Sequence, residues 1–290
     1  METLYRWSKH VEEDRLDEWE TRLIAAEVIY VAEKLVKRKR WQLSSYTTTL
    51  ARADELRARY GGSVIEVLPG DWQPAAEAEA GVLLKIRDSL VVTEGGDDEV
   101  WASLREKFPD RIVLSFPPQL AFGTGGHPTT AGCLRFLADA AKKRGAGPWS
   151  VLDLGCGSGI LSVAAAKLGA SKVVAIEDDG LALKYARVNA ERHGVRDRIE
   201  FVEADALEWI AQGGTGAFDV IVANLFSELL IRLLPDLPGS LAEGGEIVLS
   251  GFLVSQTRAV TARAESAGIP LRSFLRRGKW VAARGARANP

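Results

Sequence analysis

The sequence predicts an α/β protein with a mostly parallel sheet, an antiparallel C-terminal hairpin and a small α+β domain at the N-terminus. From about residue 129, strand-like segments alternate with helix-like ones, which is typical of a parallel sheet covered by helices on both faces. Earlier in the chain the segments are ordered β-α-β-β-α-β, which predicts a ferredoxin-like domain. We expect an N-terminal domain over 1–68, a connector over 69–120 and the main domain over 121–290.

The composition is that of a soluble globular protein. Of its 290 residues, 47% are hydrophobic and 26% are charged, which excludes a disordered chain. The 37 basic and 39 acidic side chains give a net charge of −2, without the positive field of a typical nucleic-acid binder. Two cysteines, Cys133 and Cys156, are too few for a disulfide scaffold and indicate a reducing compartment. Because no uncharged apolar run reaches about 18 residues, we expect a cytoplasmic protein without a membrane partner.

The N-terminal domain is predicted from short segments rich in charged and aromatic residues. Leu50–Tyr60 is a predicted helix ended by Gly61-Gly62, a common C-terminal signal. The segment Val28–Val36 fits a strand and also a helix. The other predicted elements are a helix over Asp14–Ala25 and strands over Tyr5–Val11, Arg40–Thr48 and Val64–Leu68.

The connector is predicted to be a linker with some strand structure. Proline and glycine punctuate it at Pro69-Gly70 and at Pro117-Pro118. Within it we expect a short helix over Ala75–Ala80, strands over Val82–Ile86 and Leu90–Thr93, and a turn at Gly95-Gly96-Asp97-Asp98.

The main domain is predicted to alternate regularly between strands and helices. Its C-terminal hairpin, Leu271–Leu275 with Lys279–Ala283, turns at Arg277-Gly278 and adds an antiparallel edge to the sheet. The predicted strands are Ser150–Leu154, Lys172–Glu177, Ile199–Val202, Phe218–Ala223 and Glu246–Ser250. The predicted helices are Thr129–Lys143, Ile160–Leu168, Leu181–His193, Ser227–Leu234 and Ser255–Ala267.

A glycine loop after the strand Ser150–Leu154 is the sharpest local motif. Gly155, Gly157 and Gly159 let the backbone turn tightly and approach a ligand, and the following helix offers free N–H groups. In open α/β sheets ligands bind at this carboxyl end of the strands. The spacing is G-x-G-x-G and not the G-x-G-x-x-G of dinucleotide binding, which disfavours NAD.

An acid at the end of the next strand completes a recognisable pattern. Glu177 lies 22 positions after Gly155 and can accept both hydroxyl hydrogens of a ribose. Over residues 149–284 this combination resembles class I S-adenosylmethionine-dependent methyltransferases, which implies a Rossmann-like sheet and S-adenosylmethionine as cofactor. In that class an acid after the third strand often lies near the adenine amino group. Asp205 matches this position, although a surface carboxylate fits it equally well.

A second motif narrows the resemblance to one family of methyltransferases. It is the string Leu120-Ala121-Phe122-Gly123-Thr124-Gly125-Gly126-His127-Pro128-Thr129-Thr130. It is similar to F-G-T-G-T-H-P-T-T of the PrmA family of ribosomal-protein lysine methyltransferases. That family modifies large-subunit ribosomal protein eleven. Its motifs A-N-I, L-S-G-I-L and A-L-K-L-G-A are similar to Ala223-Asn224-Leu225, Leu249–Leu253 and Ala165–Ala170.

The resemblance implies roles for individual residues. Thr130, Gly155 and Asn224 match family cofactor-site positions, and Glu177 matches one usually filled by Asp. Gly126 replaces the usual Thr, and Phe226 replaces a small aliphatic residue. The N-terminal domain, which in the family recognises the ribosomal protein, lacks a clear match.

The expected chemistry needs a neutral amine held in line with the sulfur–methyl bond. A free lysine has a pKa of about 10.4, and desolvation and the sulfonium charge lower it. We expect Asn224 to be the catalytic residue and to hold the amine through its side-chain oxygen. We expect Cys156 and Gly157 to contact the cofactor, with Cys156 a small packed residue and not a nucleophile. His127 fits a helix cap better than a base, and the spacing of the cysteines and histidines predicts no metal site.

Several alternatives remain open on the sequence alone. The substrate could be another protein, as in lysine methyltransferases of the electron-transfer flavoprotein, or a small molecule, and a non-catalytic cofactor-binding scaffold is a further class. Asn224-Leu225-Phe226-Ser227 lacks the Pro-Pro-aromatic sequence of nucleic-acid amino methyltransferases, which argues against a direct nucleic-acid substrate. The basic run Lys34, Lys37, Arg38, Lys39 and Arg40 is a solvated face or a contact for ribosomal RNA or an acidic protein.

Overall fold

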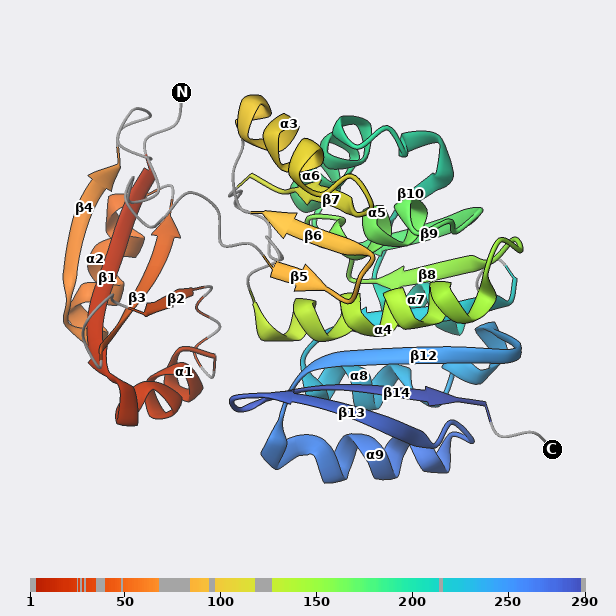
Figure 1. Ribbon diagram of the computed structural model, residues 1–290. Coiled ribbons are helices and arrows are strands. Elements are labelled where there is room, and N and C mark those ends of the chain that lie inside the picture. The colour runs from red at the N-terminus through yellow and green to blue at the C-terminus, as the bar shows by residue number, and fades with distance from the viewer. Residues whose placement is uncertain are drawn as a thin grey trace. The chain divides into compact units, whose positions relative to one another are not determined.

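The computed structural model describes most of the chain, which divides into two compact units, Met1–Glu77 and Ala78–Pro290 (Figure 1). The described residues are 4–24, 26, 28, 30–34, 40–47, 49–67, 84–93, 97–117, 127–213 and 216–287. The expected helix Ala75–Ala80, the glycines of the expected turn at 95–96, the string Leu120–Gly126 and most of the basic run lie outside these residues.

The first unit has the predicted β-α-β-β-α-β order. Its elements are β1 (Leu4–Glu12), α1 (Leu16–Ile24), β2 (Val31–Lys34), β3 (Arg40–Thr47), α2 (Leu50–Tyr60) and β4 (Ser63–Val67). The sheet order is β2-β3-β1-β4, and every neighbouring pair is antiparallel. The segment that fitted both a strand and a helix thus contains the strand β2. The prediction of a small ferredoxin-like domain is confirmed.

Aromatic side chains hold the helices of the first unit on one face of its sheet. Trp7 of β1 is fully buried, and its indole Nε1 donates to the carbonyl of Gly61, the residue that ends α2. Trp19 of α1 and Leu56 of α2 belong to the same apolar cluster, together with Leu43 of β3. The cluster accounts for the buried aromatic residues in this part of the sequence.

The second unit contains the seven-stranded sheet. Its order is β10-β9-β8-β11-β12-β14-β13, parallel from β10 to β12 and antiparallel at the C-terminal hairpin. The strands are β8 (Ser150–Leu154), β9 (Lys172–Glu177), β10 (Ile199–Glu203), β11 (Phe218–Asn224), β12 (Leu241–Leu253), β13 (Leu271–Arg277) and β14 (Trp280–Ala286). The predicted fold class, including its antiparallel edge, is confirmed.

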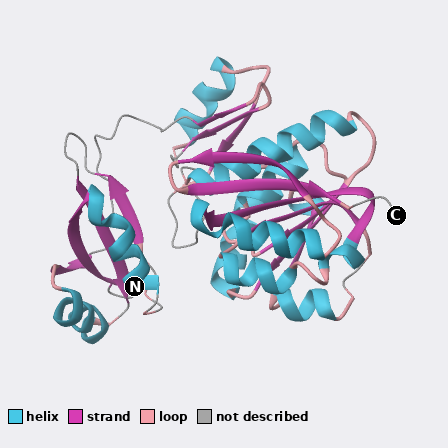
Figure 2. Ribbon diagram, turned by 90° about the horizontal axis from the view of Figure 1, so that it is seen from below, coloured by secondary structure: helices cyan, strands magenta, loops and turns pink. Residues whose placement is uncertain are grey.

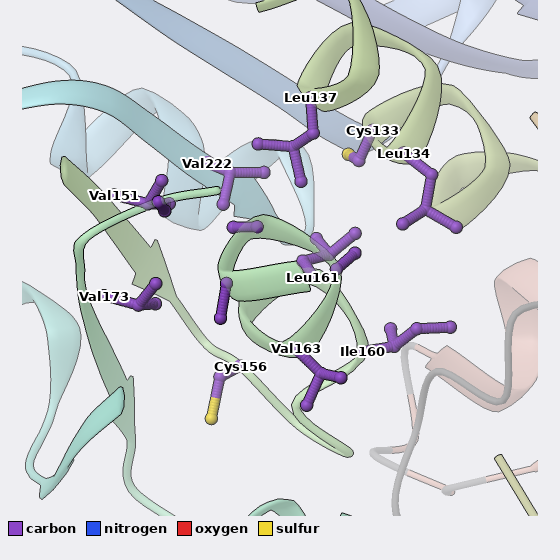
Figure 3. Packing of buried hydrophobic residues seen from close by; sticks show 14 of the residues in the cluster. Cys133, Leu134, Leu137, Val151, Cys156, Ile160, Leu161, Val163, Val173 and Val222 are labelled. Carbon is purple, nitrogen blue, oxygen red and sulfur yellow. The ribbon is translucent and has the colours of Figure 1, made fainter. Parts of the chain in front are cut away.

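Helices cover both faces of this sheet, as Figure 2 shows. They are α4 (Pro128–Arg144), α5 (Ile160–Lys167), α6 (Gly180–Arg192), α7 (Ala206–Ala211), α8 (Ser227–Leu233) and α9 (Thr257–Ser266). Val151 packs into the cluster beneath α4, α5 and α6, and the next residue, Leu152, packs into the cluster beneath α7, α8 and α9. Figure 3 shows side chains of the first cluster that come from α4, from α5 and from the strands β8, β9 and β11. Burial of alternate residues on opposite faces is the reason for the continuous apolar strands in the sequence.

The expected linker contains more regular structure than the sequence indicated. A small sheet of β5 (Leu84–Ile86), β6 (Leu90–Thr93) and β7 (Ile112–Ser115) accompanies a helix, α3 (Asp98–Lys107). The strands β5 and β6 were predicted, whereas α3 and β7 were not. The prediction that Asp97 and Asp98 belong to a turn is wrong. The Asp97 carboxylate caps α3 by accepting a hydrogen bond from the amide of Glu99, and Asp98 is the first helical residue.

A buried histidine lies between the small sheet of β5, β6 and β7 and the helix α6. His193, which follows α6, is stacked on Phe116 with ring centroids 5.0 Å apart, and its Nε2 accepts a hydrogen bond from the amide of Ser115. Trp101 of α3 lies on another side of the same imidazole, at 5.0 Å. The sheet is therefore packed on α6 and is part of the second unit.

Candidate functional site

A cleft lies where the sequence predicted a ligand site, at the carboxyl ends of β8 and β11. It encloses about 260 Å³, part of which is open to solvent. Its walls come from the glycine loop and from the first turns of α4 and α5. The lining residues are Thr130, Gly155, Cys156, Gly157, Ile160, Leu161 and Asn224. Open α/β sheets bind ligands at this position because the loops there diverge to opposite faces of the sheet.

The glycine loop is shaped by backbone conformations that other residues avoid. Gly155, Gly157 and Gly159 have φ angles of +69°, +52° and +78°. A Cβ atom on Gly155 would lie 2.5 Å from Cδ2 of Leu225, so the first glycine is also needed for packing. The loop ends where Gly159 caps the amino end of α5, whose free N–H groups face the cleft side of the sheet.

Glu177 ties the glycine loop to the end of the neighbouring strand. Its Oε2 accepts a hydrogen bond of 2.7 Å from the amide of Gly157, and its Oε1 accepts one of 3.2 Å from the amide of Asp179. Burial raises the pKa of the Glu177 carboxyl, although the two amide bonds oppose this effect. A carboxylate oxygen can accept two hydrogen bonds, so a single amide bond does not by itself fill either oxygen of Glu177.

Asn224 lines the cleft and carries an unsatisfied side-chain oxygen. The side chain ends β11, and its Nδ2 donates to Oγ1 of the buried Thr130 at 3.4 Å. Its Oδ1 is buried and has no hydrogen-bond partner. A buried carbonyl oxygen without a donor costs about 1–3 kcal/mol, so this atom favours a ligand that brings an N–H or O–H group.

Cys156 and Asp205, two further predicted site residues, differ in burial. Cys156 lines the cleft and is buried, and desolvation raises the pKa of its thiol well above the usual range, which excludes a reactive thiolate. Asp205 is exposed and caps α7, because its Oδ1 accepts hydrogen bonds from the amides of Leu207 and Glu208. That cap occupies one oxygen of the Asp205 carboxylate.

His127 is a structural residue, as the sequence indicated. Its side chain caps α4, with Pro128 at the first helical position, and its ring packs edge-on against Trp280 at 4.9 Å. Burial lowers the pKa of His127 to about 4. The imidazole is therefore neutral near pH 7.

Asp153 is a buried acid two residues before the glycine loop, to which the sequence analysis assigned no role. It is the one acid in the strand β8, directly before Leu154 and the glycine loop, and it is only 1% exposed. Ser162 of α5 donates a 2.6 Å hydrogen bond to Oδ2, whereas Oδ1 is buried without a partner. Desolvation raises the pKa of Asp153 to about 7. The available signal was a single charged residue in an otherwise apolar strand.

Comparison with known protein families identifies the family to which the chain belongs. The profile of the family described as "Ribosomal protein L11 methyltransferase (PrmA)" matches residues 84–288. The chain belongs to this family. The resemblance to the PrmA family that the sequence indicated is thereby confirmed.

Individual members of the PrmA family extend the match. The ribosomal protein L11 methyltransferase of Allorhizobium ampelinum is 34% identical over 257 residues, which cover 84% of each chain. That of Pelotomaculum thermopropionicum is 37% identical over 182 residues, and the match spans 63% of this chain and about half, 56%, of the relative. The crystal structure of a ribosomal protein L11 methylase from Lactobacillus delbrueckii subsp. bulgaricus superposes with a TM-score of 0.59 at 26% identity, covering 71% of this chain and 99% of that one.

Within this PrmA-family chain, the structure brings five of the predicted site residues into one cleft. They are Thr130, Gly155, Cys156, Gly157 and Asn224. Glu177 joins them through its bond to the glycine loop, and Asp205 lies at the end of β10. In the described part of the chain, no helix is both long and apolar enough to cross a bilayer.

Proposed function

We propose that this chain transfers methyl groups from S-adenosylmethionine to lysine ε-amino or α-amino groups of a protein, and that this protein is ribosomal protein L11. Membership of the PrmA family and the open α/β sheet support the proposal. The single observation that carries it is the buried, unpartnered Oδ1 of Asn224, a residue that lines the cleft of the glycine loop. An amine N–H is a donor that satisfies this oxygen.

The residues around the cleft fit S-adenosylmethionine. Glu177 would accept hydrogen bonds from the ribose hydroxyls, and the positive-φ glycines remove the side chains that would block a close approach to the loop. Thr130, Cys156 and Gly157 would contact the cofactor from the cleft wall. Asp205 would accept a hydrogen bond from the adenine amino group through the oxygen that the α7 cap leaves unused.

The chain's own residues must hold the amine and exclude water. S-adenosylmethionine, when bound, supplies a methyl group on a positively charged sulfur, which needs no further activation. Asn224 accepts a hydrogen bond from the neutral amine through Oδ1, which leaves the nitrogen lone pair free and fixes its direction. The apolar side chains of Ile160 and Leu161 line the cleft, and their low polarity favours the neutral form of the amine.

The first unit is the part of the chain that we assign to recognition of the protein substrate. The family profile begins at residue 84, so the first unit lies outside it. Its separate ferredoxin-like fold supports a function of its own. We propose a cytoplasmic location, where ribosomal proteins are made, and no direct nucleic-acid substrate.

The test is methyl transfer by the purified protein with labelled S-adenosylmethionine. Purified L11 and a ribosome-free lysate of the source organism are offered in parallel, and the labelled protein is identified by mass spectrometry. Label on L11 supports the proposal. Label on another protein alone keeps the methyltransferase activity and overturns L11 as the substrate. Absence of label in both samples overturns the activity.

A variant tests the catalytic assignment. Asn224→Ala removes the acceptor oxygen and is expected to lower kcat about 100-fold or more, a loss typical of a single preorganised hydrogen-bonding group. The melting temperature should change little, because Asn224 bonds only weakly to Thr130 at 3.4 Å. Asn224→Asp keeps an acceptor oxygen at the same position and is the matched control, expected to retain more activity. Full activity of Asn224→Ala would show that another group holds the amine.

A further inference from the structure

Phe226 is an aromatic residue whose position the fold does not explain. It is 63% exposed, more than any other large apolar side chain in the described part of the chain. It also occupies the N-cap of α8 and makes no side-chain cap hydrogen bond there. Ser, Thr, Asp and Asn are preferred at this position, since their oxygen satisfies a free helix N–H. A mostly exposed phenyl group gives little burial and no capping, so stability alone does not account for its presence.

The backbone around Phe226 is rigidly held. The amide of Leu225 donates to the carbonyl of Ser250 at 3.0 Å, and the carbonyl of Phe226 accepts from Leu230 at 3.1 Å. Gly251 allows this close approach, because a Cβ on it would lie 2.2 Å from the carbonyl oxygen of Leu225. Phe226 is thus fixed at both ends, between a strand pairing and the first turn of a helix.

This rigid segment joins Phe226 to the proposed catalytic group. Phe226 follows Asn224 by two residues, so their Cα atoms are at most about 7 Å apart. Asn224 ends β11 in register with Ser250, lines the cleft and carries a buried, unpartnered side-chain oxygen. The exposed ring therefore belongs to a residue held within a short distance, along the chain, of a residue that lines the cleft.

We propose that Phe226 is the residue that binds the aliphatic stem of the lysine entering the cleft. The inference rests on the proposed function. A lysine presents four methylene groups behind its amine, and such stems pack along apolar surfaces while the polar tip continues onward. An aromatic face also attracts an ammonium or methylammonium group. The ring therefore contributes to affinity for the protein substrate and not to binding of the methyl donor.

The test uses Phe226→Ser, a substitution that separates binding from folding. Serine at the N-cap satisfies a free N–H of α8 and removes an exposed phenyl group, so the melting temperature should stay equal or rise by about 2–4 °C. In the same variant we expect the KM for purified L11 to rise at least about fivefold. The kcat and the KM for S-adenosylmethionine should stay within about twofold of the unsubstituted protein. Phe226→Tyr keeps the ring and should restore the KM.

Phe274→Ser is the matched control. Phe274 is also exposed, at 45%, but it lies on the edge strand β13 and not beside Asn224. Its substitution should leave the KM for L11 unchanged. An unchanged KM in Phe226→Ser, or an equal rise in Phe274→Ser, overturns this inference while the proposed function stands. Absence of methyl transfer by the unsubstituted protein overturns the proposed function itself.

Discussion

His193 should make the second unit of the protein sensitive to mild acid. The imidazole is buried between Phe116 and Trp101, and Nδ1 lies 2.7 Å from the carbonyl of Asn189, to which it donates. Nε2 must therefore be the unprotonated nitrogen that accepts from the amide of Ser115. Desolvation and, to a smaller extent, the nearby cations Lys167 and Arg192 together lower the pKa of His193 to about 4, although the bond to Asn189 opposes them. Protonation would break the bond to Ser115.

The direction and the size of the stability change follow from the pKa of His193 in the unfolded and in the folded protein. In the unfolded chain the pKa of a histidine is about 6.5, and in the folded protein that of His193 is about 4. Stability is therefore complete above pH 6.5 and declines as the pH falls toward 4, because only the unfolded chain binds a proton in that window. The expected loss is about 2 kcal/mol between pH 7 and pH 5, with a limit of about 3 kcal/mol at lower pH.

The assay compares the unsubstituted protein with His193→Gln. Glutamine does not titrate, yet its amide can donate to Asn189 and accept from Ser115. Urea unfolding is followed at pH 8, 7, 6 and 5 at constant ionic strength, and amide exchange at Ser115 reports the bond directly. His127 also has a lowered pKa and contributes equally to both proteins, so the difference between them isolates His193. Parallel pH profiles of the two proteins would refute the reasoning.

Two further predictions concern the cleft. Asp153→Asn should raise the free energy of unfolding at pH 8 by about 2 kcal/mol or more, because burial raises the pKa of this carboxyl to about 7 and its folded, charged form is costly. Urea unfolding at pH 8 checks this, and a less stable variant would contradict it. Gly155→Ala should weaken binding of S-adenosylmethionine at least about tenfold by calorimetry, since a Cβ there meets a neighbouring side chain at 2.5 Å. Gly194→Ala shares the positive φ of about +65° in open space and should leave that affinity unchanged.

The sequence predicted most of the elements because their signals are local. The helix Leu50–Tyr60 and the strand Lys172–Glu177 were predicted to the residue, the first from its terminal glycines and the second from a continuous apolar run. The helices α3 and α7 were missed. Each begins at an aspartate cap, Asp97 or Asp205, but α3 has no buried residue and α7 has only 6 residues, so periodicity gave no clear signal.

The candidate site residues were predictable where a recognisable motif follows directly after a predicted strand. The glycine loop, Glu177 and Asn224 each end a predicted strand, and parallel strands bring their carboxyl ends together. Asp153 and Phe226 were not assigned a site role, since their significance depends on exposure. Asp153 is a charged side chain that is buried, and Phe226 is an apolar side chain that is exposed.

The sequence by itself determined the two-part α/β architecture, the family and the loop that shapes the cleft, because glycine spacing and strand periodicity are properties of neighbouring residues. Only the tertiary structure decided which polar atoms lack partners and which side chains reach solvent. Thr130 and Asn224 are 94 positions apart, and Ser115 and His193 are 78 apart, yet each pair forms a hydrogen bond. Burial and hydrogen-bond satisfaction arise from such distant contacts, so they exist only once the chain has folded.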